Sequence, residues 1–260
     1  MDCKSIKLQA HRGVSTDFPE NTMAAFIGAV EQGYDIIELD PAVTKDKKFV
    51  IMHDRTLNRT GRTADGGLLP EEKKVADATY GEISTYEFGS WFDKAFTGER
   101  APLLEEVLAL SEQTGIVLKL DNKFERFEAD DMEAFLSLLE RSQANLAFTC
   151  SRADNLIMLA KRFPKAQLHY DGRIDEETLE HLRQAVGSDR LTVWVPFANR
   201  HTTWVKVEFL DSAMAARIKK YADLGVWILS TEEEFEKAKE LGADVVETTG
   251  SIKPKKEYNI

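Results

Sequence analysis

The chain has 260 residues, of which 43% are hydrophobic and 30% are charged, a composition typical of a folded globular protein. Two cysteines are too few for a disulfide scaffold. The 34 basic and 45 acidic residues give a net charge of −11, which argues against a nucleic-acid-binding protein with a general basic surface. We therefore expect no nucleic-acid partner. A phosphate-bearing ligand would need a metal ion or a local basic cluster.

The sequence contains no uninterrupted apolar run of about 18 residues, the length needed to cross a membrane as a helix. Its first residues lack the apolar segment of a secretory signal peptide. We therefore predict no stable membrane insertion and a cytoplasmic location. The sequence leaves the oligomeric state open.

Short apolar segments rich in β-branched residues alternate with amphipathic segments along most of the chain. The predicted strands are 6–10, 36–40, 49–53, 116–121, 145–149, 166–170, 191–195, 226–229 and 244–247. The predicted helices are 22–32, 103–112, 131–141, 154–162, 176–186, 212–222 and 232–241. Because repeated strand–helix alternation produces parallel strands joined by crossover helices, the pattern predicts an α/β protein. At this length an eight-stranded (β/α)8 TIM barrel fits best, and an open doubly wound sheet is the alternative.

The first predicted strand ends in His11, Arg12 and Gly13. In TIM barrels the C-terminal ends of the strands form the active-site face. A guanidinium can grip two phosphate oxygens while a neighbouring imidazole transfers a proton, so His11 and Arg12 are candidates for phosphate chemistry. A pair of surface side chains is the simpler interpretation of this dipeptide taken alone.

Two carboxylates, Glu38 and Asp40, end the second predicted strand and alternate on one side of it. Two acids pointing into a barrel would repel each other unless a cation neutralises them. Ligands that offer only oxygen favour a hard ion, Mg²⁺ or Ca²⁺, over zinc. Salt bridges to interior lysines are the alternative interpretation.

The predicted strands 36–40 and 49–53 are separated by a turn that is too short for a crossover helix. If they form a hairpin, His53 lies opposite one of the two carboxylates, within one residue of register. A hairpin also accounts for nine candidate strands where a barrel needs eight. The segment 55–100 that follows has no clear helical or strand period, which indicates a functional insertion.

Lys119 and Asp121, at the end of the fourth predicted strand, alternate with Lys123 just beyond it, and the three are expected to share one face. Asp121 would complete a triad with the carboxylates of the second strand. Lys123 would then be a second cation for a phosphate. Lys119 lies one pleat deeper and is expected to neutralise a carboxylate, Glu38 or Glu247.

The chain also carries a series of short motifs whose order and spacing are specific in the N-terminal part. They are Ala10-His11-Arg12-Gly13, Pro19-Glu20-Asn21-Thr22, Ala25-Phe26, Gly33, Glu38-Leu39-Asp40, Thr44-Lys45-Asp46, Val50-Ile51-Met52-His53-Asp54, Thr56-Leu57, Arg59-Thr60, Pro102-Leu103-Leu104-Glu105-Glu106-Val107, Gly225-Val226-Trp227 and Gly242-Ala243-Asp244. Together these motifs resemble the glycerophosphodiester phosphodiesterase family, over nearly the whole chain.

The resemblance implies a distorted (β/α)8 TIM barrel that forms a single domain over residues 1–260, with a small insertion after the third strand at 55–100. It implies metal-dependent hydrolysis of a small-molecule glycerophosphodiester to glycerol phosphate and an alcohol, in lipid and glycerol metabolism. One divalent cation, Mg²⁺ or Ca²⁺, would be required. The residues implied are an acid–base pair, a phosphate-binding pair and a metal triad: His11 and His53; Arg12 and Lys123; and Glu38, Asp40 and Asp121.

One position departs from the family pattern. The fourth strand of the family usually carries Glu-x-Lys, whereas here Asp121 and Lys123 fill those two positions, so the acid is one methylene shorter. An Asp-x-Lys motif also resembles the sphingomyelinase D-type enzymes. A phospholipase or lyase of that type is therefore one alternative, and a non-catalytic phosphate-binding barrel is another.

Overall fold

The computed structural model describes residues 5–197 and 209–254. Eight parallel strands form a closed barrel in the order β1-β10-β9-β8-β7-β6-β5-β2. The strands are β1 (Lys7–His11), β2 (Ile36–Leu39), β5 (Val117–Leu120), β6 (Asn145–Cys150), β7 (Gln167–Tyr170), β8 (Leu191–Pro196), β9 (Asp223–Leu229) and β10 (Val245–Thr248). The predicted TIM barrel is confirmed, because β1 pairs with both β2 and β10 and leaves no open edge.

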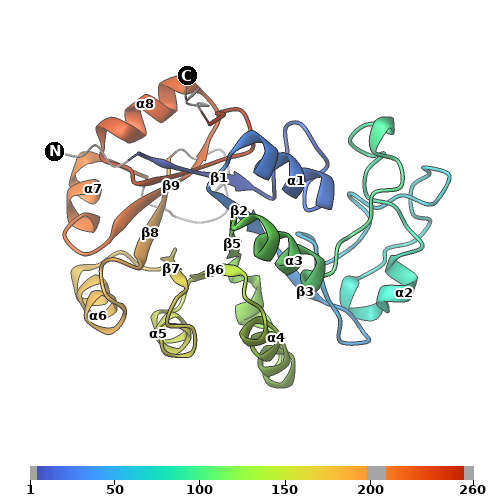
Figure 1. Cartoon of the computed structure of the whole chain (residues 1–260), viewed down its shortest axis with the longest axis horizontal. Coiled ribbons are helices and arrows are strands. Elements are labelled where there is room, and N and C mark those ends of the chain that lie inside the picture. Colours follow the sequence, from blue (N-terminus) through green and yellow to red (C-terminus); the bar gives the residue numbers. More distant parts are fainter. Residues whose placement is uncertain (1–4, 198–208, 255–260) are drawn as a thin grey trace.

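Helices connect successive strands, and Figure 1 shows them around the outside of the barrel. They are α1 (Met23–Gln32), α3 (Leu104–Thr114), α4 (Ala129–Arg141), α5 (Ala153–Arg162), α6 (Glu176–Val186), α7 (Ser212–Ile218) and α8 (Glu232–Glu240). All seven predicted helices are present. The α7 helix ends earlier than predicted, because β9 already begins at Asp223. In the described part of the chain, no helix has the length and apolar character of a membrane span.

The barrel interior is closed at its N-terminal end by an apolar layer. Ile36, Trp194 and Val245 form a buried cluster there, on β2, β8 and β10. The opposite ends of the strands carry polar residues, since β1, β2 and β5 end at or beside His11, Asp40 and Asp121. The candidate site therefore lies at the C-terminal face, as in TIM-barrel enzymes generally.

The predicted strand 49–53 lies outside the barrel. Strands β3 (Pro41–Val43) and β4 (Phe49–Ile51) form an antiparallel hairpin of their own. Because β2 pairs directly with β5, the hairpin leaves the barrel wall intact. The predicted hairpin joined 36–40 to 49–53, and its first arm is wrong: residues 36–39 form barrel strand β2, and the arm that pairs with β4 is Pro41–Val43. The predicted fourth strand, β5, is accordingly the third strand of the barrel wall.

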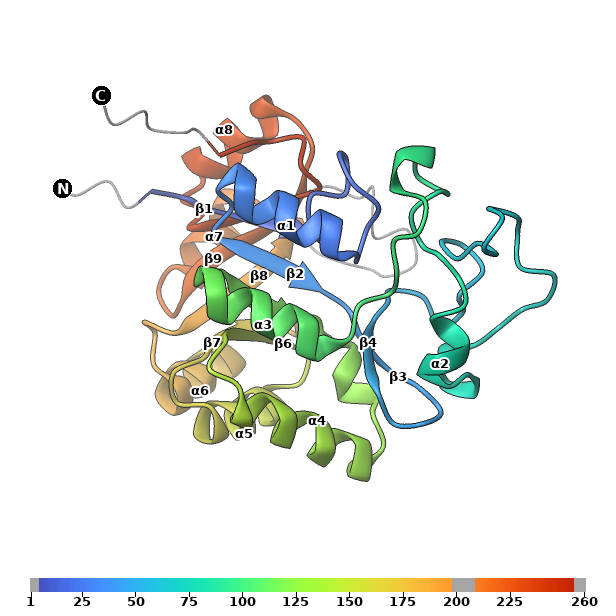
Figure 2. The same ribbon diagram turned by 45° about the vertical axis from the view of Figure 1, so that its right-hand side comes forward.

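The insertion 55–100 packs beside this hairpin, and Figure 2 shows it standing away from the barrel. It contains only short helices: the 3₁₀ helices Val75–Asp77 and Lys94–Phe96, and α2 (Tyr80–Ile83). Its buried side chains, among them Leu57 and Phe88, pack with Val50 and Met52 of the hairpin segment. This separate small core explains why the segment shows no regular period in the sequence.

Candidate active site

Three carboxylates meet at the C-terminal face of the barrel. Glu38 lies in β2, Asp40 follows that strand, and Asp121 follows β5, the strand that pairs with β2. One oxygen of each of these side chains lies within 4.8 Å of the others. Glu38 and Asp40 are only 4% and 1% exposed. The predicted triad is thus assembled, and it could hold a metal ion.

The charge of this triad is only partly compensated by the protein. Burial and the neighbouring Asp40 raise the pKa of Glu38 well above its usual range, and they raise the pKa of Asp121 to about 6. Burial acts on Asp40 in the same direction, but Lys123 and Arg12 outweigh it, so the pKa of Asp40 is lowered. Two of the three carboxylates therefore lack a matching positive charge. Three close oxygen donors with surplus negative charge fit a hard divalent cation.

Both predicted phosphate-binding residues contact Asp40. The Lys123 Nζ donates a hydrogen bond to Asp40 Oδ1, and the Arg12 Nε lies 3.3 Å from Asp40 Oδ2. The backbone N–H of Arg12 also donates to Glu38 Oε2 at 2.9 Å. The sequence predicted that Lys123 shares a strand face with Asp121, and this prediction is wrong. The chain leaves β5 at Leu120, and Lys123 lies in the 3₁₀ helix Asn122–Arg126, which brings it over the triad.

His11 is the last residue of β1, and its side chain is 18% exposed. Its Nε2 lies 4.0 Å from Glu38 Oε2 and 4.0 Å from Glu247 Oε1. Burial lowers the pKa of His11 to about 4, although the charge of Glu247 acts in the opposite direction. The imidazole beside the triad is therefore neutral near neutral pH.

His53 reaches the site from the β3–β4 hairpin. The backbone N–H of Met52 donates to the carbonyl of Asp40 at 2.8 Å, so His53 lies within one residue of the predicted register. Its Nδ1 lies 2.6 Å from Asp54 Oδ1. Burial lowers the pKa of His53, so Nδ1 of the neutral ring carries the proton that Asp54 accepts. The other ring nitrogen, Nε2, is then unprotonated and can accept a proton.

Several residues that touch the site were not predicted from the sequence. The Asn21 Nδ2 donates to Asp40 Oδ2 at 2.8 Å from a backbone with φ of 55°. Glu20 accepts hydrogen bonds from Arg12 and Arg59, and Asp54 accepts one from Arg59 as well as from His53. The motifs that contain these residues are visible in the sequence, but their contacts span up to 39 positions and have no local signal.

Lys119 lies below the triad and neutralises Glu247, one of its two predicted partners. Its Nζ lies 3.3 Å from Glu247 Oε2 and 3.8 Å from the centre of the Trp194 ring. The Trp194 Nε1 in turn donates to His169 Nδ1 at 2.8 Å. Trp194 therefore belongs to the apolar cluster with Ile36 and Val245 and also contacts the buried polar groups Lys119 and His169.

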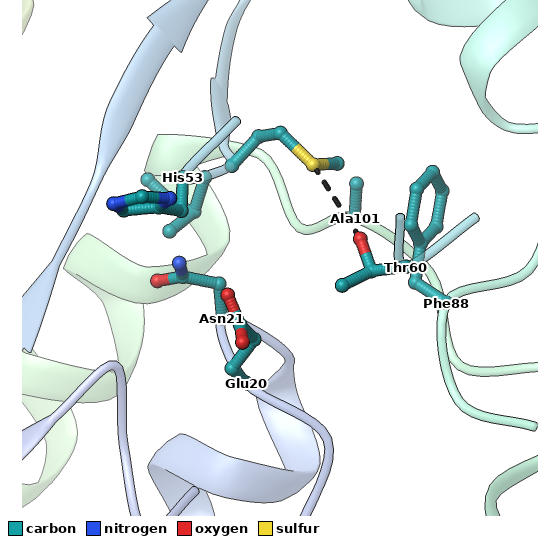
Figure 3. Close-up of a pocket in the computed structure, with 8 residues that line it drawn as sticks. Glu20, Asn21, His53, Thr60, Phe88 and Ala101 are labelled. Carbon is teal, nitrogen blue, oxygen red and sulfur yellow. Dashed lines mark hydrogen bonds between the residues drawn. The ribbon is translucent and has the colours of Figure 1, made fainter. Parts of the chain in front are cut away.

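A pocket opens beside His53, between the barrel side of the site and the insertion. Figure 3 shows Glu20, Asn21 and His53 on one side of it and Thr60, Phe88 and Ala101 on the other. Ile51 and Met52 complete the lining, and the Thr60 hydroxyl lies 3.9 Å from the Met52 sulfur. The insertion therefore supplies part of the wall next to His53.

The chain matches the model of the glycerophosphoryl diester phosphodiesterase family over residues 11–222. It is 31% identical to the uncharacterized protein YqiK of Bacillus subtilis, over 92% of each chain. It is 42% identical to a glycerophosphodiester phosphodiesterase of Caldanaerobacter subterraneus, over 44% of each chain. Among solved structures, an Oleispira antarctica phosphodiesterase in complex with the product sn-glycerol-3-phosphate has a TM-score of 0.77 at 23% identity, with 94% of this chain and 93% of that chain covered. That structural likeness concerns the fold.

Proposed function

The chain belongs to the glycerophosphoryl diester phosphodiesterase family, and from this membership we propose that it hydrolyses glycerophosphodiesters to glycerol phosphate and an alcohol, with one divalent cation and two histidines. The observation that carries the proposal is the meeting of the three carboxylates with two cations and two imidazoles at one end of the barrel. The product bound by the Oleispira antarctica phosphodiesterase supports a small-molecule substrate of this class.

The proposed metal ligands are Glu38, Asp40 and Asp121. Their uncompensated charge and their oxygen-only donor set favour Mg²⁺ or Ca²⁺. Such an ion, when bound, supplies Lewis-acid polarisation of the phosphate oxygens. Asp121 is one methylene shorter than the usual glutamate of the family, and its place as a ligand is supported by an oxygen that lies within 4.8 Å of an oxygen of each of the other two carboxylates.

Arg12 and Lys123 are proposed to bind the non-bridging oxygens of the phosphate. Both cations already lie beside Asp40, and a phosphate placed there would share their hydrogen bonds. Donors that are in place before the reaction offset charge that develops at phosphorus without further rearrangement. Asn21 holds the second oxygen of Asp40, so the carboxylate keeps its orientation when the cations turn toward substrate.

We assign His53 as the base and His11 as the acid. His53 presents an unprotonated Nε2 because Asp54 holds Nδ1, and it takes the proton of the attacking hydroxyl. His11 is proposed to give a proton to the oxygen of the leaving alcohol, a step that requires its charged form. The charge of Glu247 favours that form, whereas burial opposes it and lowers the pKa of His11 to about 4, so only a small fraction of the free protein carries this proton near neutral pH. The attacking hydroxyl belongs either to water or to carbon 2 of the glycerol, and the second route passes through a cyclic phosphate.

The test is release of glycerol phosphate from glycerophosphocholine and glycerophosphoethanolamine, followed by ³¹P NMR. We expect turnover that stops in EDTA and returns with Mg²⁺ or Ca²⁺, and that is lost in Asp121→Asn. The matched control is Asp130→Asn, an exposed residue of the α4 first turn. A ³¹P resonance of a cyclic phosphate would establish the intramolecular route.

Two results would overturn the proposal. Turnover of sphingomyelin or lysophosphatidylcholine, with none of either glycerophosphodiester, would support the sphingomyelinase D-type reaction that the Asp-x-Lys motif allows. Phosphodiester binding without any turnover, unchanged in His11→Ala, would support a non-catalytic barrel. For an acid–base catalyst, we expect that variant to lose about 100-fold or more in kcat.

A further inference from the structure

Arg59 lies in the insertion and, among the described residues, makes its side-chain hydrogen bonds to Asp54 and Glu20 and none to the triad. Its Nε donates to Asp54 Oδ2 at 2.5 Å. Its two terminal nitrogens donate to the two oxygens of Glu20, at 2.9 and 2.7 Å. The planar guanidinium thus bridges two carboxylates with three charge-assisted hydrogen bonds.

Each of these carboxylates holds a group of the proposed reaction. Asp54 accepts from the Nδ1 of His53 at 2.6 Å, and Glu20 accepts from Arg12 at 3.0 Å. The contacts therefore run continuously from Arg12 through Glu20, Arg59 and Asp54 to His53. Arg59 is the link between the phosphate-binding side and the proton-transfer side of the site.

The positive charge of Arg59 offsets the negative charges of Asp54 and Glu20. Burial on its own would raise the pKa of Asp54 and of Glu20, but hydrogen bonds from Arg59 reverse the shift and lower both. Both carboxylates are therefore ionised at neutral pH and accept hydrogen bonds on all the oxygens that face their partners. Without Arg59, Asp54 and Glu20 would be two neighbouring negative charges with one partner each.

The insertion fixes the position of Arg59. Leu57 is fully buried in the small core of the insertion, and its N–H donates to the carbonyl of Lys73 at 2.8 Å. The chain then turns back, and the N–H of Gly61 donates to the Leu57 carbonyl at 2.7 Å. A Cβ at Gly61 would lie 2.6 Å from that carbonyl oxygen, so the turn that presents Arg59 requires glycine.

We propose that Arg59 is a positioning residue, which holds Asp54 on His53 and Glu20 on Arg12, so that the insertion completes the active site. This inference rests on the proposed function for its kinetic consequence. It assigns the insertion a role in the reaction beyond its contribution to the pocket wall.

The kinetic test compares Arg59→Ala, Arg59→Lys and Arg55→Ala in the glycerophosphodiester assay. Arg55 is an exposed arginine of the same segment and controls for the loss of one positive charge. We expect Arg59→Ala to lower kcat by about 10–100-fold, the usual effect of removing a group that orients a reacting side chain. A lysine cannot bridge both carboxylates, so Arg59→Lys should recover little of the loss. Guanidinium ions added to Arg59→Ala should restore part of kcat, because this side chain is 43% exposed and its site is open to solvent.

Two further measurements separate positioning from general stability and from the proposed function. In a double-mutant cycle the effects of Arg59→Ala and Asp54→Asn on kcat should be less than additive, since both act through His53. Independently of turnover, ¹⁵N NMR of the histidine rings should show His53 with its proton on Nδ1 in the wild type and as a mixture of tautomers in Arg59→Ala. If the wild type hydrolyses no phosphodiester, the proposed function fails, and this spectrum still decides the role of Arg59. An unchanged tautomer, or a kcat no lower than that of Arg55→Ala, would overturn the inference.

Discussion

Lys119 and Glu247 face each other across the barrel interior, with the Lys119 Nζ 3.3 Å from Glu247 Oε2 and both side chains more than nine-tenths buried. The two residues come from β5 and β10, which are not neighbours in the barrel wall. The ammonium also lies 3.8 Å above the Trp194 ring. Glu247 Oε1 is in turn 4.0 Å from His11 Nε2, so this buried pair lies directly beneath one of the proposed catalytic residues.

Replacing one member of this pair should be much more damaging than replacing a member of a surface pair. We expect Lys119→Met to lower the free energy of unfolding by about 3–5 kcal/mol, because Glu247 would remain as a buried charge without its partner. Urea unfolding followed by circular dichroism measures the change. The control is Lys239→Met, because Lys239 and Glu236 are 56% and 51% exposed in their ion pair, and such pairs contribute about 1 kcal/mol or less. Equal effects of the two variants would contradict the prediction.

Metal binding should stabilise the fold, and more so near neutral pH than in acid. The pKa of Asp121 is about 6 without a cation, so protons compete with the ion below that pH. Thermal unfolding in EDTA and with Mg²⁺ or Ca²⁺, at about pH 7.5 and about pH 5, measures this difference. At a metal concentration about 100 times its Kd, we expect about 2.7 kcal/mol of stabilisation near neutral pH. The shift should vanish in Asp121→Asn, and a shift that persists there would place the ion elsewhere.

Asp171 makes a second pH-dependent contribution. This residue follows β7, accepts a hydrogen bond from the Asn122 Nδ2 at 2.8 Å, and has an Oδ1 that is buried without a hydrogen-bond partner among the described residues. Burial, then the charge of Asp121, raises the pKa of Asp171 from 3.8 to about 7. When the pKa of a carboxyl group is higher in the folded than in the unfolded state, the free energy of unfolding decreases as the pH rises between the two pKa values.

Asp171→Asn should therefore stabilise the metal-free protein more at about pH 8 than at about pH 5, by at least about 1 kcal/mol. Urea unfolding in EDTA at the two pH values measures the difference. The exposed Asp130→Asn should show no such pH dependence. An effect of Asp171→Asn that is equal at both pH values would show that its carboxyl group titrates normally.

The pH dependence of kcat/KM should show the pH at which His53, the proposed base, becomes protonated in the free enzyme. Since burial lowers the pKa of His53, the acidic limb of the profile is expected below about pH 6.5. The measurement uses saturating metal, so that loss of the ion in acid does not contribute. A bell-shaped profile is expected from an acid and a base acting together. Activity that is flat from about pH 5 to about pH 9 would exclude the two-histidine scheme.

The barrel and the triad could be predicted because local patterns encode them. Strands of a parallel barrel are buried on both faces and appear as short apolar runs, and the alternation of Glu38 and Asp40 in β2 places both acids on one side. The short turn between two such runs predicted the hairpin that brings His53 to Asp40. Each of these inferences depends on residues only a few positions apart.

The remaining contacts could not be predicted because they join distant segments. Lys123 was expected on a strand face, but β5 ends at Leu120 and a 3₁₀ turn redirects the side chain. Asn21 reaches Asp40 from a left-handed backbone conformation. Asparagine tolerates this conformation, but the presence of an asparagine in the sequence does not predict it. Arg59 meets Glu20 across 39 positions, and only the packing of the insertion sets that distance.

The chain segments that flank the insertion lie side by side. The N–H of Ile51 donates to the carbonyl of Pro102 at 2.9 Å, and Val50 pairs with Leu103. The 55–100 segment therefore leaves and rejoins the rest of the chain at neighbouring positions, and the barrel wall closes without it through the pairing of β2 with β5. Under the proposed function, we expect that replacing this segment changes which alcohol is accepted and leaves the carboxylates of β2 and β5 in place. By the inference on Arg59, a replacement segment would also have to supply a guanidinium to Asp54 and Glu20.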